Sequence, residues 1–565
     1  MSSQWYFTLQ ASEEQNVPKE VLYKTVHGML DEIGYNRHLP VIRWLGLLLL
    51  KVLKKTCNGL CVNEAGVNRL MSAMGDNPVI FAPSHRSYGD FILLSYICFH
   101  YKIQIPAIAA GMDFHSMWLM GRLLRDSCAF FMRRSFGSDK LYWTTFSEYV
   151  QKLVTDGEAA VEFFIEGTRS RSAKSLVPKF GFLSMTLVPF FTGRVPDITI
   201  VPINISYDRT LEEVLFAYEL LGVPKPKETT SGFLKALNML NERYGKVHMD
   251  FAEPLSVKEM FHASGMQRRL PTPSSPQVHT SLLPDETAFC MEVGHRVVQQ
   301  QQRHSVLSAF NLMAVMLNNS VLEGTGPPLL TEVIANISWF KSVMEVLGAL
   351  VDIQEGMECG LRQKMTMIPS INVYIHLIGH NLSHQTMDVA VPMVMLQHYV
   401  NPCLHYLVGP AMITLILRHL DDAVEISRDS LKQLEALSVM ELSKSGGLKL
   451  GNHRKLQNAS CPCSESQLLK ATQKRVEELL TSSVISHPYS LSLDMHSAAL
   501  QALTSLHAVT RLKKNGSTEY LAHTDKLLEI TEKLENLILP SEEKFHLSDA
   551  STKHFVIHGS QQAKL

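Results

Sequence analysis

Several classes of protein are excluded by what this 565-residue sequence lacks. Lys+Arg 53 against Asp+Glu 54 leaves almost no net charge, so no overall basic field attracts nucleic acid. In the most apolar early segment, Val41–Lys55, the uninterrupted apolar run is only Trp44–Leu50, and a membrane-spanning helix needs roughly 20 such residues. The first 30 residues lack the basic start and apolar stretch of a secretory signal. We therefore expect a protein that is not secreted and binds no nucleic acid.

The sequence also lacks a cysteine framework. Nine cysteines are scattered along the chain. Cys57 and Cys61 lie four apart with no His or Cys pair nearby, and Cys461 and Cys463 form a lone CPC in a polar stretch. We therefore expect reduced thiols, as in intracellular proteins.

A metal site is not predicted either. His376, His380 and His384 recur every four residues on one helical face, a spacing that zinc ligands can have. No glutamate follows the first two in the metalloprotease pattern, and no carboxylate lies nearby, so a packing face is favoured over a metal. No serine-hydrolase elbow, Walker loop or dinucleotide-binding loop occurs between a predicted strand and helix.

What the sequence does contain is a long alternation of strands and helices between residues 78 and 252. Short apolar runs such as PVIFAP and ITIVPINISYD alternate with segments of helical spacing such as FILLSYICFHYK. This alternation predicts an α/β fold with a mainly parallel sheet flanked by helices. Hydrophobic residues at 45% and charged residues at 19% fit a globular protein, and the length allows several folding units.

The flanks predict all-helical regions at both ends, separated by polar gaps. We expect an N-terminal helical region (1–74), the α/β domain (75–260), a Pro/Ser-rich linker (261–286), a helical domain (287–440), a polar linker (441–466), a small helical unit (467–540) and a flexible tail (541–565). In the first region, Val41–Lys55 is flanked by Arg43, Lys51, Lys54 and Lys55. Such a helix suits a membrane surface, and it suits docking on its own domain equally well.

The stretch SHRSYGD, directly after the predicted strand PVIFAP, contains His85 and Asp90. On a regular helix a five-residue separation leaves two side chains about 140° apart, so the pair meets only if a turn separates strand from helix. A carboxylate on one ring nitrogen would let the other nitrogen take a proton from a hydroxyl. Taken alone, a pair of this kind is more often structural than catalytic.

Basic residues follow later strands of the predicted sheet. Arg133 ends the third predicted strand, and Arg169, Arg171 and Lys174 lie in a glycine-containing loop after the fourth. Forked guanidinium groups suit a phosphate. One such cluster is easily explained as ordinary charge on a solvated loop. Several clusters at the same ends of successive strands are poorly explained in that way. Pro202, inside ITIVPINISYD, predicts an edge strand or a bend.

Four blocks, SHRSYGD, GRLLRDSCAFFMRR, FFIEGTRSRSAK and IVPINISYDR, resemble in order and spacing those of the glycerophospholipid acyltransferase family, which has an HX4D first block. The resemblance covers about residues 75–255. It implies transfer of a fatty acyl group from acyl-CoA to a hydroxyl of a phosphorylated glycerol derivative, with no metal and no bound cofactor. His85 would be the general base and Asp90 its orienting partner. The acceptor would be bound, and the acyl side shaped, by Arg133, Glu166, Gly167, Arg169, Arg171 and Pro202.

Within the family, the first and third blocks most resemble members whose acceptor is dihydroxyacetone phosphate, the starting point of ether-lipid and plasmalogen synthesis. Glycerol 3-phosphate is the nearest alternative acceptor, although its enzymes usually carry glycine where this chain has Thr168. An alternative of another class is a catalytically silent scaffold for ether-lipid enzymes. The resemblance also implies alkylglycerone-phosphate synthase as a partner.

The last three residues, Ala563, Lys564 and Leu565, are a variant of the Ser-Lys-Leu address that the peroxisomal import receptor binds. Ether-lipid synthesis begins in peroxisomes, so the blocks and the address agree. We therefore expect a peripheral protein on the luminal face of the peroxisomal membrane.

Overall fold

The structure is a computed structural model that describes residues 18–75, 77–112, 118–133, 139–224, 242–268, 282–323, 330–353, 382–419, 463–482, 487–514 and 517–538. The chain divides into two compact units, Met1–Pro410 with Thr472–Met495 and Ala411–Ala471 with His496–Leu565. Two predicted features, most of the histidine face from His376 and the peroxisomal tail, lie outside the described residues.

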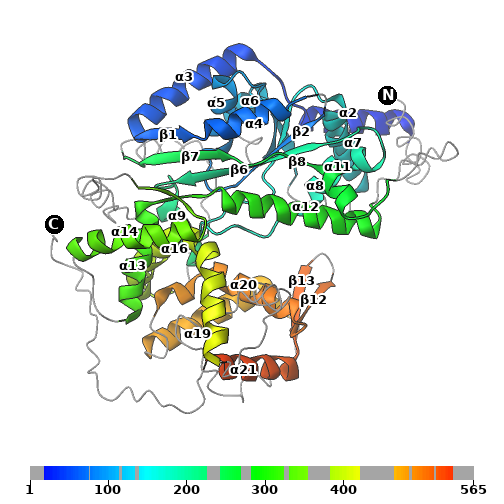
Figure 1. Ribbon diagram of the computed structural model, residues 1–565. Coiled ribbons are helices and arrows are strands. Elements are labelled where there is room, and N and C mark those ends of the chain that lie inside the picture. The colour runs from blue at the N-terminus through cyan, green and yellow to red at the C-terminus, as the bar shows by residue number, and fades with distance from the viewer. Residues whose placement is uncertain are drawn as a thin grey trace, which may run out of the picture. The chain divides into compact units, whose positions relative to one another are not determined.

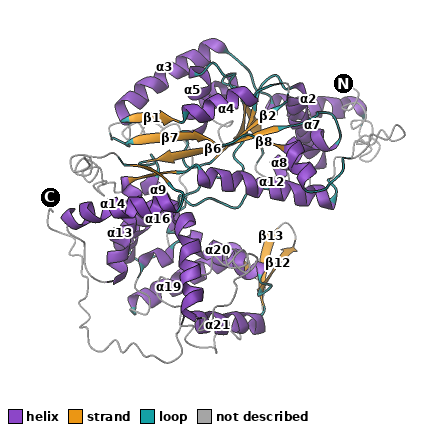
Figure 2. Ribbon diagram, in the orientation of Figure 1, coloured by secondary structure: helices purple, strands orange, loops and turns teal. Residues whose placement is uncertain are grey.

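An eight-stranded sheet forms the centre of the first unit (Figures 1 and 2). The strands run in the order β1-β7-β6-β2-β5-β3-β4, with β8 paired to β6. All pairs are parallel except those that β6 makes with β7 and β8, which confirms the predicted α/β fold. The strands are β1 (Gly59–Val62), β2 (Val79–Pro83), β3 (Ala107–Gly111), β4 (Ala129–Met132), β5 (Val161–Glu162), β6 (Thr199–Tyr207), β7 (Lys246–Phe251) and β8 (Leu255–Ser256).

Helices cover both faces of this sheet. Side chains of successive strand residues point to opposite faces. In β2, Ile80 and Ala82 therefore join a core that α7, α8 and α12 complete, whereas Val79 and Phe81 join one completed by α4 and α5. The helices of this part are α2 (Lys19–Ile33), α3 (Leu39–Thr56), α4 (Glu64–Ala73), α5 (Asp90–His100), α6 (Trp118–Asp126), α7 (Lys140–Asp156), α8 (Phe180–Phe191), α9 (Glu213–Leu220), α11 (Val257–Ala263) and α12 (Pro284–Arg303).

One strand of the sheet lies in the region predicted as purely helical. Residues 59–62 form β1, which pairs in parallel with β7. The segment is only four residues long, and its partners begin at Lys246, far along the chain. A local sequence pattern of that length does not distinguish a strand from a loop.

Pro202 lies inside the sheet, so the edge-strand prediction is wrong. Strand β6 has β2 on one side, and β7 and β8 share the other side. The β8 ladder covers Thr199 and Ile200, and the β7 ladder begins at Ile203. The Pro202 carbonyl accepts from the backbone N–H of Ala252 on that side, so the ring nitrogen faces the gap between the two ladders. A missing N–H is tolerated there.

Beyond α12, the first unit is mainly helical in its described residues, as predicted. The helices are α13 (Ala309–Glu323), α14 (Leu330–Val346) and α16 (His384–His419). The exception is a short parallel pair of β9 (Val306–Ser308) and β10 (Leu350–Asp352).

The second unit contains antiparallel strands where the sequence predicted helices alone. Strand β12 (Val509–Lys514) pairs with β13 (Ser517–Ala522), which also pairs with β11 (Cys463–Ser464). Helices α20 (Leu493–Ser505) and α21 (Thr524–Ile538) belong mainly to this unit, whereas α19 (Glu465–Thr481) begins in it and lies mostly in the first unit. Val509 and Tyr520 pack against Leu500. The charge-rich sequence of these strands does not predict this tertiary contact.

Two general properties of the described residues bear on function. No helix among them is long and apolar enough to cross a membrane. They also contain no group of three or more His, Cys, Asp or Glu side chains arranged to hold a metal ion.

Candidate active site

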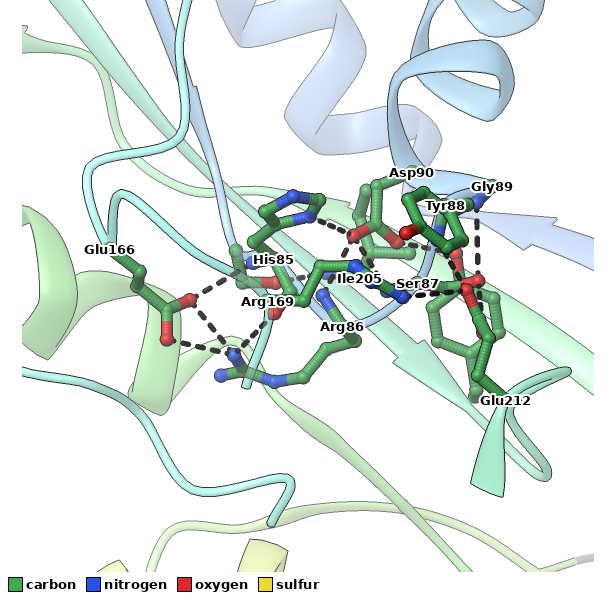
Figure 3. A network of polar contacts seen from close by, with 12 residues as sticks. His85, Arg86, Ser87, Tyr88, Gly89, Asp90, Glu166, Arg169, Ile205 and Glu212 are labelled. Carbon is green, nitrogen blue, oxygen red and sulfur yellow. Dashed lines mark hydrogen bonds and ion pairs between the residues drawn. The ribbon is translucent and has the colours of Figure 1, made fainter. Parts of the chain in front are cut away.

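His85 and Asp90 meet across a turn between β2 and α5 (Figure 3). Strand β2 ends at Pro83 and helix α5 begins at Asp90, so the intervening residues are free to fold the imidazole back over the helix start. Nδ1 of His85 lies 2.8 Å from Oδ2 of Asp90. The Asp90 side chain is fully buried, whereas that of His85 is 16% exposed. The His85 side chain is therefore accessible from solvent, whereas that of Asp90 is not.

The Asp90 carboxylate is bound by four donors. Oδ2 accepts the backbone N–H of Arg86 at 2.7 Å and that of Ser87 at 2.9 Å, besides its contact with His85. Oδ1 accepts the hydroxyl of Tyr207 at 2.5 Å. Burial and the neighbouring Asp90 charge raise the pKa of Tyr207 well above its usual value, so the phenol keeps the proton that it donates. Buried charges need such partners.

The His85 ring is fixed on its face and along its backbone. The ring stacks on Phe164 with the centroids 3.8 Å apart. The backbone N–H of His85 donates to Oε1 of Glu166 at 2.9 Å. Among the described residues no hydrogen-bond partner occupies Nε2, so this nitrogen is available to a substrate hydroxyl.

Glu166 binds the protein's own Arg86 rather than standing open to a ligand. Nη1 of Arg86 donates to Oε1 of Glu166 at 2.8 Å and to Oε2 at 3.0 Å. Glu166 also accepts the backbone N–H groups of His85 and Leu176, each at 2.9 Å, so it ties the segment that carries the histidine to the loop after β5. Arg86 is not among the residues predicted from the sequence. The available signal was its place beside His85 in SHRSYGD.

Gly167 opens a loop whose two ends are tied together. The backbone N–H of Lys179 donates to the carbonyl of Ile165 at 2.7 Å, so residues 165–179 form a closed loop. Gly167 has φ +68°, and a Cβ placed there would lie 2.8 Å from Cγ of Lys179. Both observations require glycine. Gly167 thus contributes shape rather than a functional group.

Arg169 lies on the inner side of this loop. Its guanidinium carbon stacks 3.4 Å from the ring centroid of Tyr88, and Nη1 lies 3.3 Å from Oε1 of Glu212. Glu212 also accepts the hydroxyl of Ser87 at 2.9 Å and the backbone N–H of Tyr88 at 2.8 Å. The sequence did not single out Glu212, which joins the SHRSYGD turn to the arginine loop (Figure 3).

The other residues predicted for the site, Arg171, Arg133 and Pro202, have no hydrogen bond or ion pair with the SHRSYGD turn among the described residues. Arg171 pairs with Glu219 and keeps 35% of its side chain exposed. Arg133, just beyond β4, is bound by Glu32 through Nε and Nη2. Pro202 is buried within the sheet.

Helix α16 of the helical region contacts the backbone of the arginine loop. Nδ2 of Asn401 donates to the carbonyl of Ser172 at 2.7 Å. Nδ1 of His398 lies 3.0 Å from the carbonyl of Arg171. Burial lowers the pKa of His398 to about 4, so the ring is neutral and its Nδ1–H is the donor. The helical region therefore holds the loop in place.

Two protein-family models match this chain, one over most of the α/β domain and the other mainly over the helical region that follows it. Residues 62–206 match the model of the family described as acyltransferase, and residues 216–444 match the glycerol-3-phosphate acyltransferase C-terminal region. A dihydroxyacetone phosphate acyltransferase of Oryctolagus cuniculus is 47% identical over 316 residues, which is 56% of this chain and 46% of the relative.

Two further relatives show how the similarity is distributed. A dihydroxyacetone phosphate acyltransferase of Mus musculus is 37% identical over 423 residues, which is 73% of this chain and 62% of the relative. A glycerol-3-phosphate acyltransferase of Pseudomonas syringae pv. tomato is 32% identical over 309 residues, which is 55% of this chain and 36% of the relative. The chain spans about half the length of the curated relatives it matches first.

Proposed function

Because the chain belongs to the glycerophospholipid acyltransferase family, we propose that it transfers a long-chain acyl group from acyl-CoA to the hydroxyl of dihydroxyacetone phosphate. One observation carries the proposal: Nδ1 of His85 is held at 2.8 Å by a buried carboxylate, while Nε2 has no partner among the described residues. A ring held in this way is arranged to accept a proton at Nε2.

In the proposed reaction, Nε2 of His85 removes the proton of the acceptor hydroxyl as its oxygen attacks the thioester carbonyl of acyl-CoA. The C–O bond forms, the C–S bond breaks, and CoA leaves as a thiol after taking the proton back from the imidazolium. Asp90 stabilises the imidazolium and fixes which ring nitrogen acts as base. No metal or cofactor enters these steps.

Direct transfer is favoured over a covalent acyl-enzyme. A nucleophilic cysteine needs a lowered pKa and access. Burial instead raises the pKa of Cys290 and of Cys403 to about 12, and it raises the pKa of Cys98 as well. The described cysteines with such shifts are therefore poor nucleophiles.

For the acceptor phosphate we propose Arg169 and Arg171. A guanidinium has five N–H donors, and the ion pairs with Glu212 and Glu219 each use one nitrogen of their arginine. Arg133 is a weaker candidate, since Glu32 and Asp139 contact all three of its guanidinium nitrogens.

The similarity to relatives favours dihydroxyacetone phosphate over glycerol 3-phosphate as the acceptor. Three relatives named for the former are 46–47% identical over 316–324 residues, and a fourth is 37% identical over 423 residues. Four relatives named for the latter are 32–36% identical over 288–313 residues. On this basis we propose the first step of ether-lipid synthesis, inside peroxisomes, with import directed by Ala563–Leu565 and alkylglycerone-phosphate synthase as a partner.

The test is release of CoA thiol by the purified chain from a long-chain acyl-CoA, with dihydroxyacetone phosphate or glycerol 3-phosphate as acceptor. We expect faster release with the ketone acceptor. His85→Ala should abolish release, and His100→Ala, an exposed histidine on α5, should leave it unchanged. Full activity in a folded His85→Ala variant would contradict the mechanism. If neither acceptor leads to release of CoA thiol, the alternative of a catalytically silent scaffold is favoured.

A further inference from the structure

Glu212 lies between the two parts of the proposed site. Helix α9 begins at Glu213, directly after Glu212, whose side chain is only 7% exposed. Oε1 of Glu212 accepts the backbone N–H of Tyr88 and faces Nη1 of Arg169, and Oε2 accepts the hydroxyl of Ser87. Burial raises the pKa of Glu212, and these three contacts oppose the rise because each favours the ionised carboxylate. A buried carboxylate with three such partners is held in one place.

These contacts form part of a continuous chain of hydrogen bonds from Arg169 to His85 (Figure 3). The hydroxyl of Ser87 donates to Glu212, while the backbone N–H of Ser87 donates to Oδ2 of Asp90 at 2.9 Å. The same carboxylate oxygen contacts Nδ1 of His85 at 2.8 Å. Glu212 is thus bound directly to the guanidinium proposed for the acceptor phosphate, and it is linked to the imidazole through Ser87 and Asp90.

Aromatic rings confine Arg169 as well. Its guanidinium carbon lies 3.4 Å from the ring centroid of Tyr88 and 5.4 Å from that of Phe216. Tyr88 belongs to the SHRSYGD turn, so this turn contacts the guanidinium through a ring and also through the Glu212 carboxylate. Because a packed interior leaves little free space, the guanidinium shifts only together with these partners. An anion bound by Arg169 therefore acts on the turn that carries His85.

We propose that Glu212 is a positioning residue that couples binding of the acceptor phosphate at Arg169 to the placement of His85. The inference rests on the proposed acyl transfer to a phosphorylated acceptor. Glu212 keeps the guanidinium and the turn at a fixed separation, so that an acceptor held by its phosphate presents its hydroxyl to Nε2 of His85. Part of the binding energy of the phosphate is then used to lower the barrier to acyl transfer.

A purely structural role of Glu212 predicts a different result. A buried ion pair that only stabilises the fold changes the amount of folded enzyme, so its loss slows the reaction with every acceptor by the same factor. Coupling instead predicts a loss confined to acceptors that carry a phosphate. Dihydroxyacetone has the reacting hydroxyl but no phosphate, and it therefore distinguishes the two roles.

The experiment measures release of CoA thiol from a long-chain acyl-CoA by the full chain, with dihydroxyacetone phosphate or dihydroxyacetone as acceptor. Glu212→Gln keeps the shape of the side chain and loses its charge. We expect kcat/KM for the phosphorylated acceptor to fall about ten- to hundredfold, as for the loss of a charged hydrogen bond. The fall should include kcat as well as KM. The value for dihydroxyacetone should change less than about twofold.

Inorganic phosphite gives a second measurement of the coupling. In the wild type, phosphite should occupy the phosphate site and accelerate transfer to dihydroxyacetone, and Glu212→Gln should abolish this acceleration. Arg169→Met should slow transfer to the phosphorylated acceptor, and adding Glu212→Gln to it should cost little more, because the two residues act together. If Glu212→Gln does not fold, Ser87→Ala replaces it, since this change removes the hydroxyl link and keeps the ion pair between Arg169 and Glu212.

Glu213→Gln is the matched control. Glu213 is the next residue, is similarly buried, and pairs with Arg209 and Tyr399. This variant should lower the melting temperature and slow the reaction with both acceptors by the same factor. Circular dichroism and thermal melting check that each variant is folded.

Two outcomes would overturn the coupling alone. One is an active wild type together with a folded Glu212→Gln variant that slows both acceptors equally. The other is additive losses in Arg169→Met and Glu212→Gln. A wild type that releases no CoA thiol with dihydroxyacetone phosphate or glycerol 3-phosphate would instead contradict the proposed function, and the coupling with it.

Discussion

Tyr207 donates its hydroxyl hydrogen to Oδ1 of Asp90 at 2.5 Å, while Oδ2 of the same carboxylate contacts Nδ1 of His85 at 2.8 Å. Tyr207 ends β6 and Asp90 begins α5, 117 positions apart in the sequence. A carboxylate bound at both oxygens cannot turn freely, so it holds the imidazole in one orientation. Such support from outside the reacting groups is what a preorganised site requires.

The first prediction concerns this support. Tyr207→Phe should lower kcat for CoA-thiol release about ten- to hundredfold, because a buried carboxylate oxygen without its donor costs about 1–3 kcal/mol. Asp90 and His85 themselves are unchanged. Steady-state kinetics measure the effect, and Tyr96→Phe on α5 is the control. An unchanged kcat in Tyr207→Phe would show that the hydroxyl does not support catalysis.

The second prediction concerns Glu162, which is buried on β5 with both carboxyl oxygens lacking a hydrogen-bond partner among the described residues. Burial, and to a lesser degree the charge of Asp90, raise the pKa of Glu162 well above its usual value of 4.5. The folded protein therefore keeps this carboxyl protonated at a pH where the unfolded chain has ionised it. By proton linkage, the group's contribution to stability is complete below about pH 4.5 and is lost as the pH rises toward the folded-state pKa.

Glu162→Gln removes this titration. We expect the free energy of unfolding of the variant, relative to the wild type, to rise with pH by up to about 1.4 kcal/mol for each pH unit above the unfolded pKa. Urea denaturation of both proteins at pH 5 and at pH 7.5 measures the difference. Parallel stability curves would mean that Glu162 is ionised in the folded protein.

The third prediction concerns the buried pair of Arg86 and Glu166, whose side chains are 12% and 1% exposed. Glu166→Gln should destabilise the protein by about 3–5 kcal/mol, because it leaves a buried guanidinium without its counter-charge. Arg86→Met added to this variant should cost little more, since the stranded charge is then gone. A double-mutant cycle in urea measures the coupling. Additive losses would show that the two groups do not interact.

The fourth prediction concerns the contact between α16 and the arginine loop. Asn401→Leu removes the donor to the Ser172 carbonyl and should raise the KM for the acceptor about tenfold, since 1.4 kcal/mol lost from one hydrogen bond is a factor of ten. The KM for acyl-CoA should stay unchanged. Gln397→Leu, one turn earlier, removes a contact with Asn401 itself and is the milder comparison. Equal increases in both KM values would indicate general unfolding rather than loop positioning.

The sequence determined the local elements well. The run KVHMDF coincides with β7, and the strand before SHRSYGD and the helix after it lie where the apolar spacing predicts. Local spacing carries this information because alternating and helical patterns repeat over a few residues. The family resemblance rests on such local blocks too, and the family matches confirm it.

The tertiary structure decided which of those elements and side chains meet. Strand β1 exists because of β7, and Glu166 faces Arg86 across 80 positions. Asn401 reaches Ser172 across 229 positions. No spacing rule encodes such contacts, because they depend on how distant elements pack. The sequence thus determined that His85 and Asp90 are candidates for catalysis, whereas the fold decided that they touch, since a turn and a buried tyrosine bring them together.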